Sequence, residues 1–491
     1  RANMIHNIVI GVAYRKERGL RTEKGRGFAP PRKTPLYIDY GVSWDQLEQL
    51  NVPEAHANGY TGQGVLICML DTGFDYMYGP HKSLLHIKNQ VVAQWDFINN
   101  DPVTWYDSEN DTIDARDKEQ PYHGTRMLSI VAGYLNNQLI GPAFGADFAL
   151  CKTEWYRDGG EDIIAEEHWW IAASEWADSV ADTLGYDRVI ISSSLGYRTW
   201  EDSTAYGYLN LDGNTTPLSI GADIAASRGI LVVTAIGNVT LGNPSTRPDT
   251  CIKAPADADS IIAVGGVDTA GAWAWNPDPG TGSAIGPTAD GRTKPELMAA
   301  WVCVVAHPGG GDYVDSLQAV GGTSCATALV SGVSALVWEA CSSWTNMEVR
   351  EALLETASNH ESPNDTLGWG IPDVWKAIYS RGEPDVPPFG EDELMDPYPN
   401  PFDPGAHSEV CFPYRLINET YPFLRIYTVS GELVKEFDLG RLMPGRYVWE
   451  GTGAVTWNGH NEGGDLVGSG VYLCVLSTGY NTTVKKLAVV R

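Results

Sequence analysis

Short apolar runs alternate with a helical pattern through the first half of the chain, and this alternation limits the fold more than any other feature. The runs lie at residues 64–70, 148–152, 189–192, 230–236 and 261–267. They are continuous and bounded by turn residues, as in parallel strands that are covered on both faces. Residues 163–184 carry apolar side chains at three-to-four spacing, which predicts a helix. Together they predict an α/β fold with a doubly wound parallel sheet.

Three reactive side chains fall at the ends of these elements. Asp71 closes a hydrophobic strand, His123 begins a helix within His-Gly-Thr, and Ser324 lies in Gly-Thr-Ser-Cys-Ala-Thr at the start of a long apolar helix. A serine hydroxyl becomes a nucleophile when an imidazole takes its proton, and a buried carboxylate holds that imidazole in the correct tautomer. We therefore predict that Ser324 is a nucleophile, His123 its general base and Asp71 the orienting acid.

Asn238 completes this set, because it follows a buried strand and its amide could donate to an oxyanion. Each of the four residues taken alone is more often an ordinary turn, surface or core residue. Their combination on the expected elements is more specific, and the order Asp, His, Ser is that of subtilisin. Over about residues 41–378 the chain resembles the subtilisin-like serine proteases, the subtilases.

The resemblance implies a serine endopeptidase that acts through an acyl-enzyme and needs no cofactor for its chemistry. Ser194, Leu195 and Gly196 match a family strand that pairs with the substrate backbone and forms one wall of the pocket beside the scissile bond. Gly159 and Gly160 are candidates for the opposing edge. Backbone pairing favours extended polypeptides as substrates. The acidic composition weakly favours cationic ones.

The segment after the nucleophile departs from the family pattern, with Cys325, Ala328 and Leu329 in place of Met, Pro and His. A proline at position 328 would fix its own φ and remove an N–H, so alanine lets the turn relax. Two alternatives therefore stay open. One is a variant whose acyl-enzyme reacts more with amines than in the family, which is transpeptidation; the other is a surface adhesin with an inactive protease domain. Cys325 as the nucleophile is disfavoured, because the helix start turns that residue away from residue 324.

Residues 99–119 hold seven acidic and two basic side chains. Subtilases often bind calcium for stability, so the candidate Ca²⁺ ligands here are Asp101, Asp107, Asp111 and Asp114. The spacing fits no EF-hand loop, and a solvated acidic loop is the alternative.

Charge separates the N-terminal segment from the rest. Residues 1–33 carry nine Lys/Arg and two Glu, a net +7, so a chain of net charge −28 has −28 − 7 = −35 beyond them. Subtilases are commonly made with an inhibitory propeptide, and we expect residues 1–40 to be a propeptide tail with a basic processing linker. A disordered tail is the alternative. We expect no nucleic-acid partner, and no apolar run reaches the roughly 18 residues of a membrane span.

A second domain follows the predicted catalytic domain, which covers residues 41–380. Residues 381–396 are rich in Pro, Gly and acidic side chains, which is typical of a linker. Alternating segments within residues 397–491 predict a small all-β, Ig-like sandwich. Four stretches of it, residues 398–404, 457–459, 469–472 and 484–491, resemble the C-terminal sorting domains of bacterial type IX secretion cargo.

That second resemblance implies secretion by this machinery to the surface of a bacterium or to the medium. A generic carbohydrate- or protein-binding sandwich is the alternative. The eight cysteines show no short paired spacing, although Cys251 with Cys303, or Cys411 with Cys474, could be bridged in an exported protein.

Overall fold

The computed structural model describes most of the chain and divides it into two compact units, whose main segments are residues 60–386 and 387–491. The described residues are 38–77, 81–105, 120–155, 164–197, 206–240, 252–276, 281–308, 316–385, 392–405, 407–416, 420–442, 445–447 and 454–491. The predicted propeptide tail therefore lies almost wholly outside them. Within the described ranges, every helix is too short or too polar to cross a membrane.

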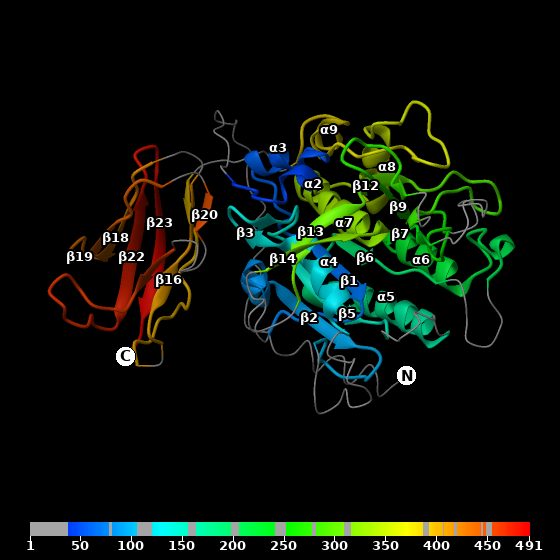
Figure 1. Cartoon of the computed structure of the whole chain (residues 1–491). Helices are drawn as coiled ribbons and strands as arrows, with labels where there is room; N and C mark the ends of the chain where they lie inside the picture. Colours follow the sequence, from blue (N-terminus) through cyan, green and yellow to red (C-terminus); the bar gives the residue numbers. More distant parts are fainter. Residues whose placement is uncertain are drawn as a thin grey trace. The chain divides into compact units, whose positions relative to one another are not determined.

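A seven-stranded parallel sheet forms the centre of the first unit (Figure 1). Its strand order is β12-β9-β7-β6-β1-β5-β2. The strands are β1 Leu66–Asp71, β2 Val91–Asp96, β5 Asp147–Lys152, β6 Val189–Ser193, β7 Ile230–Ala235, β9 Ile262–Val267 and β12 Leu297–Ala300. The predicted parallel sheet is confirmed, but the two edge strands, β2 and β12, were missed. β2 is only partly buried and β12 has four residues, so neither gives a long apolar run.

Two pairs of helices cover the sheet. α4 packs against α7, which contacts β6, β7, β9 and β12, whereas α5 packs against α6, and these contact β1, β6 and β7 (Figure 1). The helices of the first unit are α2 Trp44–Glu48, α3 Val52–Ala57, α4 Tyr122–Ala132, α5 Ile164–Leu184, α6 Pro217–Ser227, α7 Thr323–Ala340, α8 Asn346–Glu355 and α9 Val374–Tyr379, with 3₁₀ turns at η2 Lys82–Asn89 and η4 Tyr208–Asn210. Helices on both faces explain why the central strands are buried throughout.

The strand order reverses beside β1. After β1 the chain adds β2 and β5 on one side, then crosses to the other side for β6, β7, β9 and β12. In open parallel sheets, the crevice at such a switch point, outside the carboxyl ends of the strands, is where ligands bind. Asp71 is the last residue of β1, and Ser194 directly follows β6.

Short antiparallel strands complete the first unit and lead the chain to its functional residues. They are β3 Tyr134–Leu135, β4 Leu139–Ile140, β8 Asn238–Thr240, β10 Trp275–Asn276, β11 Thr281–Ser283, β13 Val302–Ala306 and β14 Leu317–Gly321. β14 ends immediately before Gly322 and α7. The strand predicted at residues 230–236 ends at Ala235, and Asn238 begins β8.

The second unit is built from antiparallel pairs around one core. Its strands are β15 Glu393–Leu394, β16 Val410–Phe412, β17 Tyr414–Leu416, β18 Phe423–Thr428, β19 Leu433–Asp438, β20 Gly445–Tyr447, β21 Val455–Trp457, β22 Gly470–Ser477 and β23 Thr482–Val489. They form sheets of order β19-β18-β22-β23, β15-β17-β20 and β16-β21. Among the described residues, Cys303, Cys411 and Cys474 form no disulfide, and Cys251 lies outside those residues.

Candidate active site

Asp71 and His123 meet at the carboxyl end of β1. The Nδ1 atom of His123 lies 2.7 Å from Oδ1 of Asp71. That carboxylate is buried and also accepts a hydrogen bond from the Thr72 N–H at 2.7 Å. The imidazole is about a third exposed, with a side-chain accessibility of 33%. This arrangement can hold the proton on Nδ1 and leave Nε2 to act as a base.

Glycine at position 124 allows this close approach of α4 to β1. A Cβ atom there would lie 2.1 Å from the Gly73 carbonyl oxygen and 3.0 Å from Cβ of Asp71. Any larger residue would push the start of α4 away from the strand end. The Gly that follows His123 in the sequence is therefore part of what positions the imidazole.

The electrostatics of His123 favour its protonated form. Burial lowers the pKa of His123, but the negative charge of Asp71 and its hydrogen bond outweigh burial, so the pKa is raised above its ordinary value of 6.5. The charge of Arg126, three residues further along α4, opposes this effect. A base with a raised pKa becomes available only at a correspondingly higher pH.

Ser324 is the second residue of α7, and its hydroxyl faces the end of β6. The Ser324 Oγ donates to the Ser194 carbonyl at 3.2 Å, and the Ser194 Oγ donates to the Ser324 carbonyl at 3.1 Å. Ser324 is thus hydrogen-bonded to Ser194, a residue of the segment predicted to pair with substrate. Catalytic hydrogen bonds are often formed only in the substrate complex, so this geometry is compatible with a Ser–His pair.

Thr323 fixes the orientation of the Asn238 amide. Oδ1 of Asn238 accepts hydrogen bonds from both the N–H and the hydroxyl of Thr323, each at 2.9 Å. The Nδ2 group lies close to Gly322, where an added Cβ would be 3.3 Å away. Asn238 is exposed. Its N–H donors therefore lie beside the nucleophile, and Thr323 is a positioning residue that the sequence interpretation missed.

The residues proposed for substrate binding are only partly described. Ser194 and Leu195 are buried and Gly196 is half-buried directly after β6, where Ser194 contacts Ser324. Gly159 and Gly160 lie outside the described residues.

The departures at positions 325 and 328 point into the packed interior. Cys325 is 1% exposed, and its thiol approaches the Val320 carbonyl of β14 at 3.7 Å. Ala328 is fully buried in α7. Cys325 thus lies on the packed side of the helix start, as expected of the residue after the nucleophile.

Of the four expected calcium ligands, Asp101 alone lies among the described residues. Asp101 uses Oδ1 to accept from the Val103 N–H at 2.8 Å, and its backbone pairs with Asp96. The other three candidates, Asp107, Asp111 and Asp114, lie outside the described residues. Within the described ranges, there is no group of three or more His, Cys, Asp or Glu side chains that could hold a metal ion.

The chain is similar to known proteins over most of its first unit. The model of the subtilase family, peptidase S8, matches residues 62–370. Subtilisin NAT of Bacillus subtilis subsp. natto is 28% identical over 324 residues, which cover 65% of this chain and 66% of that protein. Subtilisin of Bacillus pumilus is 28% identical over 322 residues, covering 65% and 92% respectively. The solved structure of the MycP3 protease from the type VII (ESX-3) secretion system aligns at 22% identity with a TM-score of 0.47, covering 72% of this chain and 93% of that one.

Proposed function

Because the chain belongs to the subtilase family of serine endopeptidases, we propose that it hydrolyses peptide bonds with Ser324 as nucleophile, His123 as general base and acid, and Asp71 as the orienting carboxylate. The observation that carries this proposal is the buried carboxylate of Asp71 at 2.7 Å from a partly exposed imidazole. Ser324 is the second residue of the neighbouring helix α7, which packs against α4.

Each proposed residue has one task in the reaction. The Ser324 oxygen attacks the scissile carbonyl while His123 Nε2 takes its proton, and the oxyanion receives a hydrogen bond from Nδ2 of Asn238. The imidazolium then protonates the leaving amine, and the C–N bond breaks to give an acyl-enzyme. Water then attacks this ester while His123 Nε2 takes its proton. The C–O bond of the ester breaks, His123 returns the proton to the Ser324 oxygen, and the carboxylic acid product leaves. None of these steps calls for a cofactor.

An extended polypeptide is the substrate that fits this arrangement. Ser194 contacts the nucleophile, and residues 194–196 continue from a strand whose end faces Ser324. A substrate backbone paired along them would bring its carbonyl to the serine.

Labelling with a fluorophosphonate probe tests the nucleophile. The wild-type protein, with any propeptide remnant removed, should be labelled, and Ser324→Ala should not. Ser331→Ala is a matched control in the same helix, because its buried hydroxyl donates to the Thr327 carbonyl. It should be labelled like the wild type. A folded, processed wild type that stays unlabelled would contradict the proposal and favour a binding protein.

We also propose that the second unit directs export as a type IX sorting domain. Three of the stretches that carry this resemblance pack together: the Trp457 ring lies 6.3 Å from that of Phe402 and 6.2 Å from that of Tyr472. The fourth joins them, because Phe402 donates its N–H to the Ala488 carbonyl at 2.8 Å. A chain that ends at residue 386 should be retained in the periplasm of a bacterium that has this machinery. Unchanged appearance in the medium would contradict this role.

The N-terminal segment and calcium remain separate proposals. Residues 1–40 are proposed as a propeptide tail and processing linker, supported by their basic charge before an acidic chain. N-terminal sequencing of the secreted protein should then find a start beyond them. Structural calcium is proposed only for the acidic segment at 99–119, and chelation that leaves the thermal midpoint unchanged would exclude it.

A further inference from the structure

Lys253 belongs to a short extended segment that connects the two polypeptide stretches of the candidate site. The Lys253 N–H donates to the Ile236 carbonyl at 3.1 Å, two residues before Asn238. The next residue, Ala254, exchanges backbone hydrogen bonds of 2.8 and 3.0 Å with Tyr197, directly after Gly196. The Lys253 segment is therefore hydrogen-bonded on one side to the chain just before Asn238 and on the other side to the chain just after Gly196.

The side chain of Lys253 is directed to the substrate-strand side of this segment. Ile252 and Ala254 are fully buried, whereas Lys253 is half-buried. Successive side chains of an extended chain point to opposite faces, so Lys253 points away from the core that takes its neighbours. A Cβ atom built on Gly196 would lie 2.8 Å from Cβ and 3.3 Å from Cδ of Lys253. The methylene chain thus occupies the space above Gly196 that a side chain would need.

This position is close to the nucleophile. Ser194 and Gly196 are two residues apart, so in an extended chain they share a face and are separated by about 7 Å. Ser194 exchanges hydrogen bonds with Ser324 through both its hydroxyl and its carbonyl. The Lys253 chain, which lies over Gly196, is therefore about one two-residue repeat along the chain from Ser194, the residue that contacts the nucleophile.

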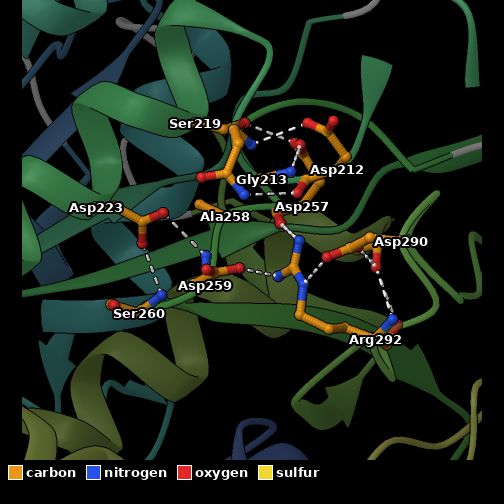
Figure 2. A network of polar contacts seen from close by, with 12 residues as sticks. Asp212, Gly213, Ser219, Asp223, Asp257, Ala258, Asp259, Ser260, Asp290 and Arg292 are labelled. Atoms are coloured by element: carbon orange, nitrogen blue, oxygen red, sulfur yellow. Dashed lines mark hydrogen bonds and ion pairs between the residues drawn. The ribbon is translucent and has the colours of Figure 1, made fainter. Parts of the chain in front are cut away.

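A polar network holds the residues that follow Lys253 (Figure 2). The Asp257 carboxylate accepts from the Gly213 N–H at 2.8 Å and from the Ser219 hydroxyl at 2.6 Å. Arg292 donates to the Asp257 carbonyl at 2.8 Å. Asp223 accepts from two N–H groups further on, those of Asp259 and Ser260. Side chains on a backbone fixed in this way are positioned before substrate arrives.

From these contacts we propose that Lys253 selects substrates with an acidic residue, glutamate in particular, on the acyl side of the scissile bond. This inference rests on the proposed peptidase function and specifies its substrate class. An ammonium group has three N–H donors, so a substrate carboxylate can join the interactions that Lys253 makes within the chain. The local preference is opposite to the one expected from the net charge of −28.

Two peptides that differ only in Glu or Gln at this position test the proposal, because the two side chains have nearly the same shape. A charge-assisted hydrogen bond in a partly buried site should raise kcat/KM for the Glu peptide by about ten- to a hundredfold over Gln. Lys253→Met should reduce that ratio to about one, Lys253→Arg should keep most of it, and Lys253→Glu should invert it in favour of a Lys peptide. The ratio within one variant is independent of how much of that variant is active.

Lys376→Met is the matched control, because it removes the same charge from an exposed residue of α9. It should keep the wild-type ratio. Equal rates for Glu and Gln in the wild type, or a Glu preference that survives in Lys253→Met, would overturn the inference. Fluorophosphonate labelling separates the two levels: a labelled protein without Glu preference contradicts only the role of Lys253, whereas an unlabelled wild type contradicts the peptidase itself.

Discussion

Asp71 and Asp257 are both buried carboxylates of the first unit, yet their surroundings differ in kind. Asp71 contacts the imidazole of His123, which is a third exposed. It can therefore influence proton transfer between that imidazole and a bound substrate. Asp257 accepts from a backbone N–H and a serine hydroxyl, neither of which titrates near neutral pH. A buried aspartate thus indicates a reactive site only through the partner it meets.

Burial acts on both regions, but it decides the direction of the pKa shift only at Asp257. Burial raises the pKa of Asp257, and its hydrogen bonds from Ser219 and Gly213 offset this only in part. For His123, burial lowers the pKa but the charge of Asp71 reverses the direction. Asp257 supports the backbone around it, whereas Asp71 sets the pKa of the base, His123.

Removing the charge of Asp71 is expected to have the largest effect. Asp71→Asn should lower kcat/KM by about 10⁴-fold, the loss measured for the equivalent change in other serine-protease triads, because the imidazole tautomer is no longer held. Asp257→Asn removes a charge of the same type from the other region. It should change kcat/KM far less, and equal losses in the two variants would break the comparison. Steady-state kinetics on one peptide substrate measure both.

The pH profile adds a second readout for the same variant. His123 must be neutral to accept a proton, and its pKa is raised by Asp71. The acid limb of kcat/KM in the wild type should therefore lie above pH 6.5, with activity increasing as pH rises through it. In Asp71→Asn the raising charge is gone while burial remains, so the limb should move to lower pH. A limb that stays in place would mean that another group controls it.

Asn238→Ala is expected to have a smaller effect on the same chemistry. It should lower kcat by about 10²- to 10³-fold with little change in KM, a range that was itself measured on a subtilisin. Asn346→Ala is the matched control, since its buried amide donates to the carbonyls of Ala226 and Ile230. The control should lower the thermal midpoint and leave kcat nearly unchanged. An increase in KM with unchanged kcat in Asn238→Ala would contradict an oxyanion role.

The pattern of apolar residues along the sequence was enough to predict the central strands and the candidate residues at their ends. The central strands are buried on both faces and so appear as continuous apolar runs, and the residues at their ends could be identified as candidates. Edge strands such as β2 and three-residue strands such as β16 carry too little pattern. The predicted strand at residues 230–236 runs one residue past Ala235, because Ile236 is also apolar.

The positioning contacts could not be predicted, because they join residues that are distant in the sequence. Thr323 and Asn238 are 85 residues apart, and their hydrogen bonds depend on how β14 delivers the chain to α7. Lys253 contacts Gly196 only because Ala254 pairs with Tyr197. Nothing in the local sequence distinguishes Lys253 from a surface lysine.

The smallest effect on catalysis is expected from Asp257→Ala, which should act mainly on stability. The change leaves the Gly213 N–H and the Ser219 hydroxyl without their buried acceptor. Losing two such partners should lower the free energy of unfolding by about 2–4 kcal/mol. Well below the unfolding transition, kcat/KM should fall by less than about tenfold, because the side chain touches no reacting atom.

Chemical denaturation and peptide kinetics on the same preparation separate the two effects. The Glu-to-Gln ratio should fall modestly as well, since Asp257 holds the segment that follows Lys253, whereas the acid limb set by His123 should stay where it is. A large loss of kcat/KM with unchanged stability would place Asp257 in the catalytic region. The distinction between a supporting and a reactive buried aspartate would then fail.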